Sequence, residues 1–259
     1  MKKKRIIFSI SIVLLVVAAV LVQYLQFKPT AAHKPATVAS SAASSSSAAK
    51  KSVKPLQGNV TDKDLENKKT YEVPQTDEET DKYVESGPAE KVGEYTISPQ
   101  GNKAELGQTT ENKQTLTNGA FTYEVTQIKV FHNDPRTDEA IQMAQTALNS
   151  RDINGPYTTL SIQYKLKNNG AKAAVTDGVE SATFSTGDVR SPINGLDNDA
   201  TLATKVLAAN STTSSFVTIL VPSSIAKTVK TVDISFAGLL DQNHSNQLAK
   251  PSQKLQLTF

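Results

Sequence analysis

Three aspartates have the residue type and spacing that best match metal chemistry. Asp197 and Asp199 are two residues apart in GLDNDAT, and Asp188 can join them from the preceding turn. Carboxylate oxygens arranged in this way can bind Ca²⁺. The segment lacks the sixth-place glycine and the closing glutamate of an EF-hand, and Asx-rich loops commonly hydrogen-bond to their own backbone. We treat the three aspartates as a calcium candidate, with self-contained turns as the alternative, and expect no other metal site.

The histidines, at positions 33, 132 and 244, are the candidate general bases. His33 lies in a low-complexity segment, and His132 and His244 are predicted in loops. The sequence has no G-x-S-x-G turn to present a nucleophile, and a histidine zinc site needs two or three close ligands. It has no glycine-rich phosphate loop, and spacing alone identifies no carboxylate pair for glycoside hydrolysis. We therefore predict no catalytic residue, no cofactor and no enzymatic activity.

Composition excludes further classes of function. The chain has no cysteine, so it has no disulfide, thiolate metal site, cysteine nucleophile or lipobox attachment. An exported chain without disulfides is more typical of bacteria than of eukaryotes. Four of the 28 basic residues stand at positions 2–5, which leaves 24 against 25 acidic residues elsewhere. The net charge of +3 therefore reflects the N-terminal cluster, and we expect no nucleic-acid partner.

Alternating apolar residues predict the strands that would have to position any site. In LSIQYKL every second residue from Leu160 to Leu166 is apolar, and the run stops at Asn168-Asn169-Gly170. A second alternation begins at Phe121 and changes parity before Ile128, which predicts a β-bulge near Thr126–Gln127. FVTILV is apolar on both faces, as in a central strand buried on two sides. Further strands are predicted at 179–185, 214–222, 231–236 and 254–259.

One helix of about 12–14 residues is predicted between these strands, in DPRTDEAIQMAQTALNSRDINGP. Asp134 can cap it, and Pro135 suits the first helical position. Its apolar residues form a single stripe, and Asn154-Gly155-Pro156 would end it. Because the polar face is not basic, packing on the core is a better explanation than membrane binding. The stripe consists of Ala140, Ile141, Ala144, Ala147 and Leu148.

The N-terminal region is typical of a membrane anchor. The basic residues 1–5 are followed by an apolar run from Ile6 to Val22, which spans about 26 Å as a helix, or about 33 Å if it continues to Phe27. A bilayer core is about 30 Å thick, and the basic cluster would keep the N-terminus inside. We predict a single-pass anchor at 6–27 with the rest of the chain outside the cell. A cleaved signal peptide, which would give a secreted protein, is the alternative.

Residues 28–103 are predicted to be a disordered stalk. The first part is rich in Ser, Ala and Lys, and the second is acidic and turn-rich, so neither can bury enough apolar surface to offset ordering its backbone. GEYTI at 93–97 could lie along the domain, but we expect no helix or strand before residue 104. The stalk would either raise the head above the membrane or serve as a linker without a length requirement.

The head, residues 104–259, resembles the telokin-like or immunoprotective-extracellular-protein-like immunoglobulin-like domains of Gram-positive extracellular proteins. The resemblance lies in the order of several short motifs over about residues 104–240. It implies a mainly β fold, an immunoglobulin-like β-sandwich with one inserted helix, and it implies no activity. The long insertion before Tyr157 and the tail after Leu240 depart from the pattern. The motifs are Leu106-Gly107; Tyr123, Val125, Ile128 and Val130; Lys167–Asn169; Val221-Pro222; and Val232, Ile234 and Phe236.

Three functions are compatible with this organisation. The favoured one is a membrane-anchored extracellular binding or adhesion module, held by residues 6–27, whose head meets a protein or cell-wall ligand. The second is a structural or stress-related envelope protein that regulates a membrane partner. The third is a hydrolase without a recognisable motif, which a deep pocket holding His132 or His244 against a carboxylate would favour.

Overall fold

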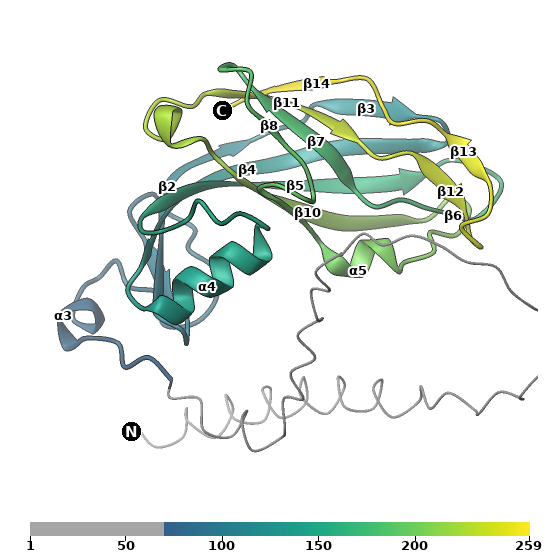
Figure 1. The fold of residues 1–259 in the computed structure, drawn as a ribbon. Coiled ribbons are helices and arrows are strands. Elements are labelled where there is room, and N and C mark those ends of the chain that lie inside the picture. The colour runs from purple at the N-terminus through teal and green to yellow at the C-terminus, as the bar shows by residue number, and fades with distance from the viewer. Residues whose placement is uncertain (1–69) are drawn as a thin grey trace, which may run out of the picture. The chain divides into compact units, whose positions relative to one another are not determined.

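The computed structural model describes residues 70–259, so the predicted basic tail, the anchor at 6–27, most of the stalk and His33 lie outside the described residues. Strands dominate the described part (Figure 1). Within it, no helix combines the length and the hydropathy that crossing a bilayer requires. The elements are α3 (Gln75–Glu78), β1 (Tyr95–Ile97), β2 (Asn102–Glu111), β3 (Thr115–Asn118), β4 (Phe121–Pro135), α4 (Asp138–Ala147), β5 (Tyr157–Asn168), β6 (Ala174–Val175), β7 (Val179–Phe184), β8 (Val189–Arg190), β9 (Leu196–Asn198), α5 (Ala200–Ala203), β10 (Thr212–Leu220), the 3₁₀ helix η1 (Ser223–Ile225), β11 (Thr231–Phe236), β12 (Leu239–Asp241), β13 (Gln247–Ala249) and β14 (Leu255–Thr258).

The strands form antiparallel sheets that pack face to face. The largest sheet has the order β1-β2-β4-β5-β10-β9, and β3 pairs with β4 beside it. A four-stranded sheet, β14-β11-β7-β8, and a three-stranded sheet, β13-β12-β6, form the opposite layer (Figure 1). The sheets are not closed into a barrel. The prediction of a mainly β fold is confirmed.

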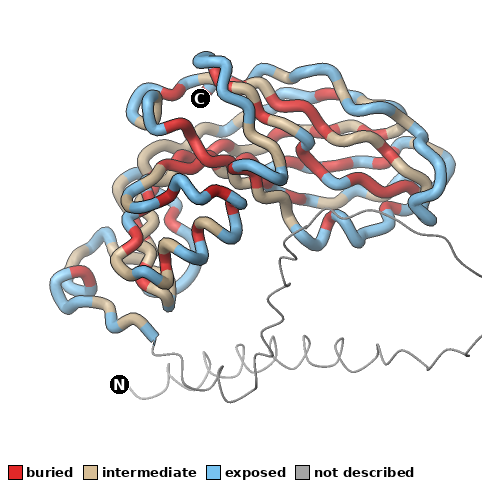
Figure 2. Tube along the Cα trace, viewed as in Figure 1, coloured by how far each residue is buried: buried red, intermediate tan, exposed pale blue. Residues whose placement is uncertain are grey.

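The core lies between the two layers and is built by the predicted alternation. Along β5 the residues Leu160, Ile162, Tyr164 and Leu166 are buried, whereas Gln163 and Lys165 between them are exposed (Figure 2). Phe236 of β11 stacks on Tyr123 of β4 with 3.8 Å between the ring centroids. Burial of such rings on both inner faces supplies the main driving force that holds the layers together.

The β-bulge predicted near Thr126–Gln127 is confirmed. The register between β4 and β5 shifts between Val125 and Gln127, so the apolar side chains on both sides of the shift face the core. The expectation that FVTILV is buried on two sides holds at one end only. Leu220 faces the helix side, whereas Phe216 is 44 % exposed, because α4 covers the outer face only at the end of β10.

The expectation that no helix or strand precedes residue 104 is wrong. The segment from 71 to 97 contains α3 and β1, and β1 pairs with β2 along the edge of the large sheet. Asp77 is the main anchor of this segment: it accepts hydrogen bonds from the Arg136 guanidinium and from the Tyr95 hydroxyl. Lys129, also buried, donates to the Ala89 carbonyl oxygen at 2.9 Å. Polar contacts to distant residues, which no local pattern reveals, order this stretch.

The predicted helix exists, but its start differs from the prediction. Asp134 and Pro135 belong to β4, because this strand continues between β2 and β5 as far as residue 135. The helix α4 begins at Asp138, and the side chain of Thr137 caps it by accepting a hydrogen bond from the Ala140 amide. Ala140, Ala144 and Leu148 are buried as the stripe predicts, whereas Ala147 is exposed.

Candidate functional site

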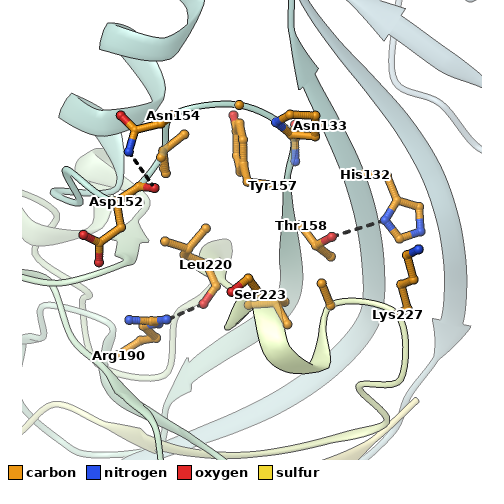
Figure 3. Close-up of a pocket in the computed structure, with 15 residues that line it drawn as sticks. His132, Asn133, Asp152, Asn154, Tyr157, Thr158, Arg190, Leu220, Ser223 and Lys227 are labelled. Atoms are coloured by element: carbon orange, nitrogen blue, oxygen red, sulfur yellow. Dashed lines mark hydrogen bonds between the residues drawn. The ribbon is translucent and has the colours of Figure 1, made fainter.

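A cavity of about 830 Å³ lies at the end of the sandwich that carries α4 (Figure 3). Volumes of about 300–1,000 Å³ are typical of small-molecule sites. Four segments of the chain form its walls, among them the loop between α4 and β5. The lining residues are His132 and Asn133 of β4; residues 152–158, from Asp152 to Thr158; Arg190 of β8; Leu220 at the end of β10; and Val221, Ser223, Ala226 and Lys227 after it.

Backbone hydrogen bonds join the walls to one another and to the elements beside them. The Gly195 amide donates to the Leu148 carbonyl oxygen at the end of α4, and the Leu220 amide donates to the Gly195 carbonyl oxygen, each at 2.7 Å. The Val221 amide donates to the Thr158 carbonyl oxygen at 2.9 Å. The loop before β9, the end of β10 and the helix therefore form a continuous framework around the cavity.

Arg190 is the most firmly positioned charge in the cavity. Its Nε donates to the Leu220 carbonyl oxygen at 3.0 Å. A Cβ at Gly195, where φ is 78°, would stand 2.7 Å from the Cδ of Arg190. Only glycine adopts this φ without strain, and only glycine leaves room for the arginine side chain. Gly195 is thus required for the position of Arg190.

The apolar wall is a small cluster beneath α4. Ala144 of α4 and Leu148, the C-cap of the helix, pack with Ile153 and Leu220, and the partly buried Tyr157 packs against this cluster. The Gln145 side chain donates to the Ile153 carbonyl oxygen at 2.7 Å and holds the loop against the helix. Burial raises the pKa of the Tyr157 hydroxyl, so this phenol stays neutral at neutral pH.

Cationic side chains outnumber carboxylates among the residues that line the cavity. Arg190 and Lys227 are cationic, and Asp152 is the single carboxylate among the lining residues. In the view of Figure 3, Arg190 and Asp152 lie on one side of the cavity, and His132 and Lys227 lie on the other. Within residues 70–259, neither Arg190, Lys227 nor Asp152 forms an ion pair. The ion pairs between described residues involve Asp77, Glu94 or Asp134.

His132 stands in β4 and not in the loop that the sequence predicted. Its Nδ1 lies 3.3 Å from the Thr158 hydroxyl on the neighbouring strand. Glu105 is its partner on the other side in the sheet register, which brings a carboxylate, a histidine and a hydroxyl into one row. The Nε2 atom, however, occupies the space over Gly107, where a Cβ would be 2.4 Å away. The row therefore does not form the carboxylate–histidine–hydroxyl relay of a hydrolase, in which the two ring nitrogens face the acid and the nucleophile.

His244 lies far from the cavity lining, in the turn between β12 and β13, with φ of 57°. The same turn is organised by Asp241, whose carboxylate accepts hydrogen bonds from Asn246 and Ser245. These bonds, that of the Asn246 side chain above all, hold the pKa of Asp241 well below its usual range. The turn is self-contained.

The three candidate calcium ligands do not form a cluster. Asp188 accepts a hydrogen bond from the Thr186 hydroxyl in an exposed turn, and Asp199 caps α5 by accepting from the Thr201 amide. Asp197 lies in β9, where burial raises the pKa of its carboxyl group. Across residues 70–259, no group of three or more histidine and acidic side chains is placed to hold a metal ion. The alternative of self-contained turns describes Asp188 and Asp199.

The sequence did not point to the cavity. Arg190, Asp152 and Lys227 come from three separate loops and strand ends, and no spacing connects them. One signal was present in retrospect. Asn194-Gly195 is a typical turn pair that ends five residues after Arg190, and a turn glycine is compatible with the close approach of a side chain.

Comparisons with known proteins do not assign the chain to a family. No family model matches the sequence, and no curated protein is significantly similar to it. Among solved structures, the chain is similar to a functionally unknown protein from Listeria monocytogenes EGD-e, with 13 % sequence identity and a TM-score of 0.41. The similarity covers 60 % of this chain and 86 % of that protein. Likeness at this level supports no conclusion about function.

Proposed function

We propose that the protein is a membrane-anchored, surface-exposed binding module whose ligand enters the cavity between the α4–β5 loop, β8 and the segment after β10. The observation that carries the proposal is the cavity itself. Its volume suits a small ligand or the end of a chain, and it combines an apolar wall with convergent polar groups. Such a composition is typical of binding sites, in which a few polar groups orient a ligand that apolar contacts retain.

The arrangement of the cavity favours binding over catalysis. Its histidine contacts the hydroxyl of a β-branched threonine inside a strand, where a nucleophile cannot approach a substrate freely. Its second ring nitrogen lies against Gly107 and is not directed at a carboxylate. General acid–base catalysis needs a titrating group within hydrogen-bond reach of a bound substrate, and His132 is engaged with its own sheet.

The proposed architecture of the head is an immunoglobulin-like β-sandwich. Two antiparallel layers packed over one core support it, together with the order of motifs that resembles the immunoglobulin-like domains of Gram-positive extracellular proteins. The apolar segment at 6–27 and the basic residues before it support anchoring with the head outside the cell. In such sandwiches, loops at one end commonly carry the binding site.

Blocking the cavity tests the proposal. Gly155 lines the cavity, and a Cβ there would meet no atom within 4 Å, so Gly155→Trp fills the space without backbone strain. The full chain in nonionic detergent would be sedimented with isolated envelopes of its own cells. Ala203→Trp, on the exposed surface of α5, is the matched control.

We expect the wild type and Ala203→Trp to bind the envelopes and Gly155→Trp to lose most of its binding. Failure of the wild type to bind, or equal binding by Gly155→Trp, would overturn the proposed function. Circular dichroism of each variant separates loss of binding from loss of fold.

A further inference from the structure

We propose that the ligand of this cavity is an apolar monocarboxylate, whose carboxylate binds the outer edge of the Arg190 guanidinium. This inference rests on the proposed function and specifies the chemistry of its ligand. It is carried by the hydrogen bonding of Arg190, by the balance of charge in the cavity and by the apolar wall of the cavity.

Arg190 is prepared to bind an anion. It is partly buried, and its Nε is committed to the Leu220 carbonyl oxygen, which fixes the plane of the guanidinium (Figure 3). Within residues 70–259 its two terminal nitrogens have no acceptor, and no acidic side chain pairs with it. A planar guanidinium presents parallel N–H groups that match the two oxygens of a carboxylate. A partly buried arginine that has no carboxylate partner in the protein is stabilised when a ligand provides the carboxylate.

The balance of charge favours a single negative charge on the ligand. Arg190 and Lys227 contribute two positive charges and Asp152 contributes one negative charge, so these three side chains together leave one net positive charge in the cavity. A monoanion neutralises it. A phosphate dianion would bring a second charge into the cavity that holds the Asp152 carboxylate, at an electrostatic cost.

The apolar wall determines the rest of the ligand. Ile153, Tyr157 and Leu220 line the cavity, and the first and last are buried members of the cluster beneath α4. An aromatic or aliphatic body fits against this wall while the carboxylate reaches Arg190. A fully polar anion would leave this part of the cavity without a favourable contact.

The test compares probes that differ in charge and not in shape. The full chain in nonionic detergent would be titrated by calorimetry with 2-naphthoate, with the neutral 2-naphthamide and with naphthyl phosphate. Gly155→Trp reveals any binding outside the cavity, including binding to micelles. Arg190→Gln removes the proposed anchor, and Lys205→Gln, an exposed lysine of the α5–β10 connection, is the matched control for charge.

We expect naphthoate to bind the wild type at least about tenfold more tightly than naphthamide, because a charge-assisted pair to arginine gives a factor of this order. Arg190→Gln should abolish that preference and leave naphthamide within about twofold, and Lys205→Gln should change neither. Equal affinity of the wild type for naphthoate and naphthamide, or tighter binding of the phosphate, would overturn the inference. If Arg190→Gln does not fold, Arg190→Lys, which keeps the charge but not the planar fork, should reduce the preference; an unchanged preference would count against Arg190.

The two proposals can fail separately. If Gly155→Trp loses envelope binding while Arg190→Gln keeps it, the binding function stands and the carboxylate ligand is wrong. If Gly155→Trp binds envelopes as the wild type does, the cavity is not the functional site and the binding proposal fails, whatever the probes show.

Discussion

Replacing Asp77 by asparagine should release the segment from 71 to 97 while the sandwich stays folded. The substitution keeps the size of the side chain and removes its charge. In the wild type the carboxylate accepts hydrogen bonds from Arg136 and from Tyr95, and the ammonium group of Lys103 lies 3.9 Å away. These contacts join α3 to the β1–β2–β4 edge of the large sheet, so their loss acts on this edge first.

The magnitude follows from the burial of the pair. The side chains of Arg136 and Asp77 are 23 % and 12 % exposed, so the pair is neither a surface ion pair nor a fully buried one. Hydrogen bonds to charged partners contribute about 1.5–3 kcal/mol when they are this well shielded. We expect the free energy of opening this segment to fall by about 2 kcal/mol, which corresponds to about a 30-fold faster amide exchange in it.

Native-state hydrogen exchange measures this opening directly. The amides of Val84 and Tyr95 bond within the segment, to the carbonyl oxygens of Tyr95 and Lys82, and should lose protection, whereas amides of β5 should not. Asp81→Asn, an exposed change in the same segment, is the matched control. Unchanged protection in Asp77→Asn, or equal loss in Asp81→Asn, would refute the reasoning.

The pH dependence gives an independent check. The hydrogen bond from Arg136 is the main cause that lowers the pKa of Asp77 below its ordinary value. The ionised carboxylate therefore stabilises the segment fully above the unfolded pKa of about 3.9, and this stabilisation is lost as the pH falls through the lower, folded pKa. Protection of the Val84 amide should decrease over that acid range in the wild type and stay flat in Asp77→Asn.

Three shorter predictions concern the core, the sheet and the calcium candidate. Phe236→Ala should reduce the free energy of unfolding in urea by about 3–5 kcal/mol, because the ring is fully buried. Phe216→Ala, at a 44 % exposed position, should reduce it by less than about 1 kcal/mol, and equal losses would contradict the two-layer core. Gly107→Ala should destabilise the protein by about 1–2 kcal/mol in the same assay, because the new Cβ would stand 2.4 Å from the Nε2 of His132. Adding His132→Ala to this variant should restore most of the lost stability, and a double variant as unstable as Gly107→Ala alone would argue against the clash. Millimolar Ca²⁺ should leave the thermal unfolding midpoint unchanged, since the candidate aspartates are not clustered, and a rise that Asp199→Asn abolishes would revive the site.

The strands that could be predicted are those in which apolar residues alternate with polar ones, because one face of the strand is buried and the other is not. β5 and β11 each have one face in the core, so the alternation of apolar residues marks β11 to the residue and β5 to within three residues at each end. β2 shows no such alternation, because Leu106 is its one large apolar residue. Its extended conformation comes from pairing with β4. His132 was predicted in a loop for the same reason. The sequence His132-Asn133-Asp134 is polar, and pairing with the neighbouring strands keeps it extended.

No local pattern in the sequence brings the residues of the candidate site together. Arg190 matters because Gly195 and the Leu220 carbonyl oxygen position it, and these contacts join parts of the chain that are up to 30 residues apart. The ordering of the segment from 71 to 97 depends in the same way on Arg136, which is 59 residues from Asp77. Long-range polar contacts of this kind leave no periodicity in the sequence.

The pairing of β1 with β2 has a practical consequence for anyone who truncates the chain. Residues 93–97 satisfy the outward backbone groups of β2 between 103 and 106. A fragment begun at residue 104, where strand-like sequence first becomes evident, would lose the first two residues of β2 and leave the outward backbone groups of residues 104–106 unpaired. Unprotected strand edges recruit other chains, so such a fragment should aggregate, and one that retains the segment from residue 70 should stay in solution.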